Sequence, residues 1–188
     1  MVNRHTELLA AARAGDRDAL AVLWRDHHPA LLRYLRARRS PAPDDVASQV
    51  WIDVARSIDR FEGDLTDFRR WLFTIAHRRS VDEIRRLVRS AEPSALSVRA
   101  ADRVAGADEQ YEHHTALDRA IALVATLPEN QAEAVMLFVV NELPAADVAE
   151  IMQTTEGNVR VLVHRGVTRL RRRMSVTDAS SPTMKRVP

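Results

Sequence analysis

Apolar side chains recur every three or four positions along most of the chain, which is the spacing of one face of an α-helix. In residues 18–38, leucines and a tryptophan follow this spacing, while arginines and aspartates fill many of the positions between them. We find no convincing two-residue alternation of the kind that marks a half-buried strand. The sequence therefore predicts an all-α protein. Helices are expected over residues 6–14, 18–38, 45–58, 68–89, 114–126, 129–141, 145–152 and 154–174.

The helical pattern fades between residues 90 and 112, where alanine, serine, aspartate and glutamate dominate. This composition is typical of a linker, because it offers few large apolar side chains to bury. The chain has 188 residues, 46% of them hydrophobic, which suffices for two small cores. We expect two small helical domains joined by a flexible linker. The expected boundaries are 1–90 for the first domain, 91–112 for the linker, 113–174 for the second domain and 175–188 for a disordered tail.

The last predicted helix, residues 154–174, has two distinct faces. Its apolar positions share one face, and its basic positions lie on the flanks and the opposite face. Thr154 or Thr155 can cap its start, because a hydroxyl there accepts a free backbone N–H. An isolated helix of this kind is most often a solvated surface helix. The apolar positions are Val159, Leu162, Val163, Val167, Leu170 and Met174.

A short helix that precedes this basic helix changes the interpretation. Residues 145–152 follow Pro144, and a turn of three or four residues separates them from the basic helix. Small Ala149 lets the two helices cross closely, which is the pattern of a helix-turn-helix whose second helix enters the major groove of DNA. The alternative is an ordinary helical hairpin. Candidate base contacts are Gly157, Asn158, Val161 and Arg165, and candidate contacts at the flank are Arg160, His164 and Arg169.

Charge is segregated along the chain, although the net charge is only +2. Residues 69–89 hold seven arginines against Asp82 and Glu83, and residues 154–174 hold six arginines against Glu156. Each stretch therefore carries a local charge of +5, and the remaining residues sum to −8. Two basic stripes on an otherwise acidic chain indicate two contacts with a polyanion.

Aromatic and basic residues alternate in FRRWLFTIAHRRSVDEIRR, residues 68–86. Rings at helical spacing are usually core residues, so Phe68 and Trp71 have this simpler interpretation as well. The loop that begins at Phe61 directly precedes the basic helix, however. A basic helix with nearby rings can also hold an unstacked base, because stacking and attraction to the backbone do not require a duplex.

Several classes of site are excluded or disfavoured. The chain has no cysteine, which excludes disulfides, thiolate zinc sites and cysteine nucleophiles, and suits a reducing compartment. The paired histidines at 27–28 and 113–114 do not form an HExxH motif, and no Walker loop, GxGxxG or GxSxG occurs. No apolar run approaches the roughly 20 residues of a membrane span. We expect a cytoplasmic protein without membrane insertion, with no catalytic residues, no metal and no cofactor.

The basic and aromatic segments, together with the helix at 44–61, resemble a known family in both order and spacing. The stretch DDVASQVWIDVARSIDRF, residues 44–61, resembles region 2.2 of the group IV, or extracytoplasmic-function (ECF), sigma factors of the sigma-70 superfamily. FRRWLFTIAHRRSVDEIRR resembles regions 2.3 and 2.4, and residues 127–171 resemble region 4. The resemblance covers residues 6–174. It implies a specificity subunit that directs RNA polymerase core to promoters, melts the −10 element and reads the −35 element.

The resemblance also implies partners and site residues. The partners would be the β′ clamp of RNA polymerase core, promoter DNA and an anti-sigma factor. Core polymerase would be bound by Asp45, Val46, Gln49, Val50, Trp51 and Asp53. The −10 element would be bound by Phe61, Asp64, Phe68, Arg69, Trp71, His77, Arg78, Arg79, Asp82, Arg85 and Arg86. The −35 element would be bound by Thr155, Glu156, Gly157, Asn158, Arg160, Val161, His164, Arg165 and Arg169.

The chain departs from the family pattern at three points. Ser48-Gln49 replaces the usual Gln-Glu pair of region 2.2, and Arg78 stands after His77 where relatives often carry Asn. The start of the recognition helix, residues 157–162, lacks the usual Ser and second basic residue. The promoter sequence therefore does not transfer from relatives. The alternative function is a stand-alone helix-turn-helix regulator, which would explain the C-terminal segment but not the second basic stripe.

Overall fold

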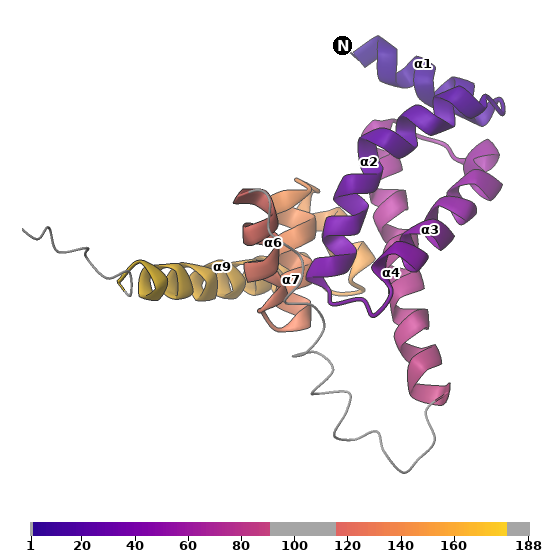
Figure 1. The fold of residues 1–188 in the computed structure, drawn as a ribbon. Coiled ribbons are helices and arrows are strands. Elements are labelled where there is room, and N and C mark those ends of the chain that lie inside the picture. Colours follow the sequence, from indigo (N-terminus) through magenta and orange to yellow (C-terminus); the bar gives the residue numbers. More distant parts are fainter. Residues whose placement is uncertain (1, 91–115, 180–188) are drawn as a thin grey trace, which may run out of the picture.

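The computed structural model describes residues 2–90 and 116–179, and within them every element is helical. This confirms the prediction of an all-α fold. Figure 1 shows the arrangement of the helices. In chain order they are α1 (Val2–Arg13), α2 (Arg17–Ala37), α3 (Pro43–Ser57), the 3₁₀ turn η1 (Ile58–Arg60), α4 (Leu65–Ser90), α6 (Ala116–Ala125), α7 (Glu129–Val135), the π-helical turn η2 (Met136–Val140), α8 (Ala145–Ile151) and α9 (Glu156–Ala179).

Helix α4 begins three residues earlier than the sequence pattern indicates, because Asp64 caps it. The Asp64 Oδ1 atom accepts the backbone N–H groups of Thr66 and Asp67, at 2.7 and 3.0 Å. In return, Asp67 Oδ2 accepts the backbone N–H of Asp64 at 3.0 Å. This reciprocal pairing satisfies the free donors of the first turn. The expected loop over 61–68 is therefore shorter and ends at Asp64.

Two expectations for the C-terminal half also change. Helix α9 continues to Ala179, so the first five residues of the predicted tail prolong the helix. The helix expected over 129–141 changes to a π-turn at Met136, which Asn141 closes by donating its side-chain and backbone N–H groups to the Met136 carbonyl. The expected linker at 91–112 and residues 180–188 lie outside the described residues.

Helices α1–α4 and η1 form the N-terminal unit, residues 2–90. Leu23, Leu31 and Leu35 of α2 are fully buried, and they share a core with Val50 of α3 and Leu72 of α4. These side chains lie at the helical spacings of the sequence pattern. Burial of a leucine or valine side chain stabilises a fold by about 1.5–3 kcal/mol, so this shared core fixes the relative positions of α2, α3 and α4.

Helices α6–α9 and η2 form the C-terminal unit, residues 116–179. Val148 and Ala149 of α8 pack with Val159 of α9, as expected for a helix-turn-helix. Gly166 lets α9 approach α7, because a Cβ at this position would lie 2.9 Å from Val135 Cγ2. Gly166 therefore allows the basic helix α9 to pack closely against α7.

The two units contact each other directly, which the sequence does not predict. In Figure 1, α6 and α7 lie beside α2, and α9 extends away from the N-terminal unit. Arg39 at the end of α2 donates to the Leu127 carbonyl at 3.3 Å. Helix α4 also contacts α8, where Arg70 pairs with Glu150 at 3.2 Å.

Candidate nucleic-acid and polymerase interfaces

The start of α9 is set by a tight turn after α8. Gln153 adopts a left-handed conformation with φ of 51°, which reverses the chain direction between the two helices. Thr155 then caps α9, since its hydroxyl accepts the backbone N–H of Asn158 at 3.2 Å. The Asn158 side chain in turn donates to the Thr154 hydroxyl at 2.9 Å. The sequence prediction that Thr154 or Thr155 caps this helix is confirmed for Thr155.

All nine residues predicted to contact the −35 element are exposed on α9 or the turn before it. Fully buried Val159 anchors the helix on the opposite side. Among the nine, Arg160 pairs with Glu156 one turn away at 2.8 Å. This exposed ion pair contributes little stability, so a phosphate can replace Glu156 as the partner of Arg160. The helix thus presents polar and cationic side chains to solvent along its first turns.

The aromatic residues predicted to contact the −10 element form a cluster instead of an open pocket. Phe68 is fully buried and Phe61 is 8% exposed, so both belong to the core. The Phe61 ring stacks on Trp71, with centroids 5.0 Å apart. Because Phe68 cannot reach a base without leaving the core, the predicted contact does not fit this conformation. Phe68 is a core residue, as the simpler interpretation of the sequence states.

The loop between Phe61 and α4 presents an exposed surface beside this cluster. Glu62, Gly63 and Asp64 are exposed, and Arg13 donates to the Gly63 carbonyl at 3.1 Å. Gly63 has φ of 130°, and a Cβ there would lie 2.6 Å from the Asp67 side chain. Glycine is therefore required at this position, and the loop has a defined shape.

The predicted −10 arginines of α4 fall into two groups. Arg78, Arg85 and Arg86 are exposed, as is Asp82. Arg86 pairs with Glu83 at 2.8 Å, and Arg85 lies 3.6 Å from Asp82. Because these pairs are exposed and local, they leave the arginines free to exchange partners for phosphates.

Arg79 belongs to the second group, because it makes a bidentate contact with Asp53 of α3 through Nε and Nη2. The hydrogen bond from Arg79 to Asp53 raises the pKa of the arginine further above its usual value. The sequence assigns these two residues to different partners, promoter DNA and polymerase. The structure brings them together, where they join α3 to α4.

The residues of α3 predicted to contact polymerase lie on two faces. Asp45 and Gln49 are exposed, whereas Val46, Val50 and Trp51 are buried in the core of the N-terminal unit. In this conformation the protein's own helices cover these three side chains, and the prediction that they contact polymerase stays a prediction. Burial follows from the helical spacing, which places all three toward α2 and α4.

Sequence reasoning missed Ile52 on the exposed face of α3. Its side chain is 39% exposed, and it follows Gln49 by three positions, so both lie on one face. An isoleucine among polar residues on a helix surface is a recognisable sequence signal. The predicted apolar face of this helix included only its valines and its tryptophan, so Ile52 was left out. The exposed face of α3 thus includes Asp45, Ser48, Gln49 and Ile52.

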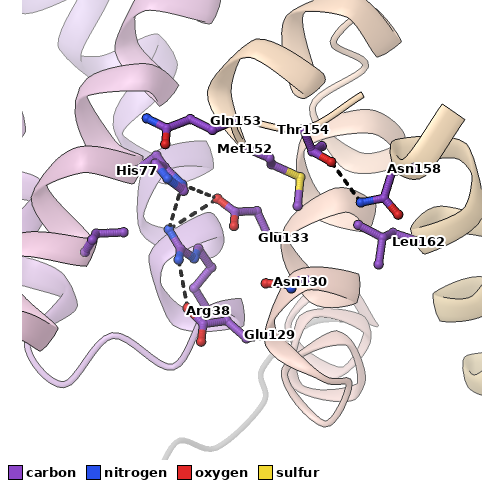
Figure 2. A pocket seen from close by; sticks show the side chains of 11 residues that line it. Arg38, His77, Glu129, Asn130, Glu133, Met152, Gln153, Thr154, Asn158 and Leu162 are labelled. Carbon is purple, nitrogen blue, oxygen red and sulfur yellow. Dashed lines mark hydrogen bonds and ion pairs between the residues drawn. The ribbon is translucent and has the colours of Figure 1, made fainter. Parts of the chain in front are cut away.

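Two further residues of the predicted −10 surface contact the C-terminal unit. Arg69 donates to the Asn141 carbonyl, and His77 Nδ1 lies 2.8 Å from Glu133 Oε1. Figure 2 shows His77 and Arg38, from the N-terminal unit, facing Glu129 and Glu133 of α7.

Glu133 is the centre of this contact. Arg38 Nη1 lies 3.2 Å from its carboxylate, and the Tyr34 hydroxyl donates to it at 2.6 Å. Burial alone would raise the pKa of Glu133, but the hydrogen bond to His77 and the charge of Arg38 outweigh it and lower that pKa. Burial, with the nearby carboxylate, raises the pKa of Tyr34 well above its usual value. Glu133 is therefore ionised and Tyr34 neutral at pH 7.

Next to this contact lies a cleft of about 380 Å³ between the two units. Arg38, His77 and Val81 line it from the N-terminal unit, and Thr154, Asn158 and Leu162 line it from the C-terminal unit. Figure 2 shows Asn158 and Thr154 on the side opposite His77. The first turn of α9 therefore faces the N-terminal unit.

The described residues, 2–90 and 116–179, also bear on metal and membrane sites. In these residues no group of three histidine or acidic side chains could hold a metal ion. No helix in the same two ranges is both long enough and apolar enough to cross a bilayer.

Comparisons with known proteins agree with this organisation. Residues 23–90 match the family "Sigma-70 region 2", and residues 117–170 match "Sigma-70, region 4". The chain is 31% identical to the ECF RNA polymerase sigma factor ShbA of Streptomyces griseus, over 87% of this chain and 92% of ShbA. It is 32% identical to the ECF RNA polymerase sigma factor SigD of Mycobacterium tuberculosis, over 87% of this chain and 81% of SigD.

A solved structure of CnrH in complex with the cytosolic domain of CnrY has a similar fold. Its TM-score is 0.60 at 21% identity, and the match covers 94% of this chain and 99% of CnrH. Sigma factors are transcription initiation factors and not catalysts. The match to both sigma-70 regions excludes the alternative of a stand-alone helix-turn-helix regulator. The chain belongs to the ECF sigma factors of the sigma-70 family, and it acts as an alternative sigma factor that directs transcription initiation.

Proposed function

We propose that the chain binds bacterial RNA polymerase core through the exposed face of α3 and binds promoter DNA through α4 and α9. The observation that carries this proposal is the pair of cationic helices in the family order, each with exposed arginines. Backbone phosphates supply most of the affinity in such complexes, and base contacts supply the specificity.

On α9, the −35 element is read by the exposed side chains of the first turns. Asn158 and Arg165 face the bases, because a recognition helix places its N-terminal half in the major groove. Asparagine can pair with adenine and arginine with guanine, each through two hydrogen bonds. Arg160 and Arg169 bind the flanking phosphates.

On the N-terminal unit, the −10 element is bound by the exposed loop 62–64 and by Arg78, Arg85 and Arg86 of α4. The buried rings of Phe61 and Phe68 support this loop from below. Extrusion of a base from a duplex costs a few kcal/mol, so a loop of fixed shape next to arginines lowers the cost of melting.

The partner of α3 is the β′ clamp of core polymerase. Ile52 is an apolar side chain left exposed between polar neighbours, as expected for the centre of a contact. CnrH was solved with the cytosolic domain of CnrY. By analogy with CnrH, we expect that an anti-sigma partner also binds this chain.

Co-elution of the purified chain with bacterial core polymerase tests the α3 assignment. We expect Ile52→Asp to weaken co-elution about tenfold or more, because it places a charge in the apolar centre of the contact. Leu117→Asp is the matched control, since Leu117 is 46% exposed on α6 of the C-terminal unit. Equal co-elution of wild type and Ile52→Asp, with unchanged melting temperatures, would reject α3 as the docking face.

A further inference from the structure

Val161 is an exposed apolar side chain on the helix that is proposed to read the −35 element. It lies in the second turn of α9 and is 43% exposed. Among residues 156–165, all of which the structure describes, Val159 is buried and Leu162 and Val163 are half-buried, so Val161 is the one exposed apolar side chain there. A single exposed valine is common on protein surfaces, so its position on the helix is what matters.

Val161 points away from the helices that support α9. Side chains two residues apart on an α-helix point about 160° apart, so Val161 lies almost opposite fully buried Val159. Val161 is also absent from the described residues that line the cleft between the two units. It therefore lies at the centre of the outward face of α9, with Gly157 one turn before it and Arg165 one turn after it.

The turn that precedes Val161 leaves its two methyl groups accessible. Side chains on an α-helix lean toward the N-terminus, so the surface that Val161 covers lies over the turn of Gly157. Gly157 has no side chain, and a Cβ there would meet nothing within 4 Å. A base edge can therefore approach Val161 along the N-terminal part of α9, which is the part of a recognition helix that contacts bases.

The neighbours of Val161 on the outward face are polar or charged. Asn158 lies three positions before it and Arg165 four positions after it, and both are exposed. Arg160 and His164 are exposed beside them. The centre of a protein contact is depleted of charged residues, so these surroundings do not suit a protein partner. They suit duplex DNA, which combines anionic phosphates with polar base edges.

Thymine is the one base that carries a methyl group on its edge in the major groove. Valine offers only methyl groups, so its contact with the thymine methyl removes apolar surface from water on both sides. Against the amino group of cytosine or adenine, valine displaces water and leaves a hydrogen-bond donor unpaired, which weakens binding. An exposed valine among base-reading side chains therefore favours thymine.

From this position, and resting on the proposed −35 contact, we propose that Val161 determines promoter specificity by recognising thymine at one position of the −35 element through its C5-methyl group. Asn158 and Arg165 read neighbouring positions through hydrogen bonds. Burial of one methyl-sized group shifts a binding equilibrium about fourfold, which sets the size of the effect at this position.

Replacement of thymine by uracil tests the contact, because uracil lacks the C5-methyl group and keeps the base pair. The full chain is assembled with purified bacterial core polymerase, and one promoter found by 5′-end mapping is randomised over its −35 element. Sequencing of the templates that this holoenzyme selects gives the preferred base at each position. Synthetic promoters then carry uracil in place of each preferred thymine, one position at a time, and competition measures their affinity for the holoenzyme.

We expect one thymine at which uracil weakens binding of the wild type about fourfold. Val161→Ser has a similar helix propensity but lacks both methyl groups, so it should bind the thymine and uracil templates equally. Val161→Thr keeps one methyl group and should retain about twofold discrimination. The matched control is Val139→Ser, since Val139 is 48% exposed on η2, outside α9, and this variant should discriminate as the wild type does.

Equal affinity of the wild type for thymine and uracil at every −35 position would overturn the proposal, as would a selected −35 element without a preferred thymine. An undiminished fourfold effect in Val161→Ser would also overturn it, because another side chain would then contact the methyl group. Since uracil changes the DNA and not the chain, altered folding cannot produce the wild-type result.

Failure of the proposed function is seen at an earlier step. A wild-type chain that selects no promoter in 5′-end mapping rejects the proposed function and the methyl contact together. A wild-type chain that selects promoters but does not distinguish thymine from uracil rejects the methyl contact alone.

Discussion

The two proposed DNA-binding surfaces of this sigma factor differ in how many of their residues also contact the rest of the protein. On α9, every predicted −35 contact is exposed, and the ion pair of Arg160 is local. On the N-terminal unit, Phe68 is in the core, Arg79 is paired with Asp53, and His77 is paired with Glu133. Within the described residues, the side-chain hydrogen bonds and ion pairs of the proposed −35 residues are local. On the proposed −10 surface several residues also support the fold, so we expect mutations there to affect stability as well as the proposed DNA binding.

The largest effect is expected from Phe68→Ala. Removal of a fully buried aromatic side chain should lower the free energy of unfolding by about 3–5 kcal/mol. Urea titration followed by circular dichroism measures this loss. A variant of unchanged stability that fails only in promoter melting would show that Phe68 is free to contact a base, and would remove the contrast between the two surfaces.

The next effect concerns pH and His27, whose ring lies 5.4 Å from that of Phe68. Burial, with the positive charge of Arg69, lowers the pKa of His27 from 6.5 to about 4. The unfolded chain binds a proton at His27 more readily than the folded chain does. The free energy of unfolding is therefore at its full value above pH 6.5 and decreases as the pH falls toward 4. The loss amounts to at most about 3.4 kcal/mol.

Urea midpoints at pH 7 and pH 4.5 measure this dependence. His27→Gln should reduce the difference between the two midpoints, and His164→Gln, at an exposed position of α9, should leave it unchanged. An equal difference in wild type and His27→Gln would show that other groups cause the acid sensitivity.

Gly166→Ala tests the support of the exposed surface. The new Cβ would lie 2.9 Å from Val135 Cγ2 and 3.3 Å from Leu127 Cδ1, so we expect a loss of about 1–3 kcal/mol in stability. Gly157→Ala on the same helix is the matched control, since its Cβ would meet nothing within 4 Å. If the melting temperatures of both variants match that of wild type, α9 does not depend on this close approach.

Arg165→Ala tests base reading on α9 without a change in stability. We expect −35 binding to weaken by about 1–3 kcal/mol and sequence preference to relax at one position. Selection of bound duplexes from a random library by wild type and variant measures both. A uniform loss on every sequence would assign Arg165 to the phosphates.

The smallest effect is expected for the pair Asp53–Arg79. Its partly exposed side chains should show a coupling energy of about 0.2–1 kcal/mol in a double-mutant cycle of unfolding. Additive losses for Asp53→Ala and Arg79→Ala would mean that the pair does not join α3 to α4. Arg79 would then be available to DNA like its neighbours.

The sequence predicts the helices and the exposed surface of α9 well, because helical spacing directly reports which side faces solvent. It predicts less of the N-terminal unit. Spacing places Arg79 on a flank of α4 but does not indicate that Asp53, 26 positions away, is its partner. The contact of Arg38 with Glu133 joins helices nearly a hundred residues apart, and no local pattern encodes such a pairing. The early start of α4 depends on Asp64, a cap that a fuller use of capping signals would have found.

The central claim is that the chain selects promoters for RNA polymerase through two separate surfaces. Its most direct test is mapping of transcript 5′ ends made in vitro from genomic DNA by purified core polymerase, with and without the chain. We predict a discrete set of starts that share one −10 and one −35 sequence and appear only when the chain is present. The same scattered starts in both reactions would contradict the account.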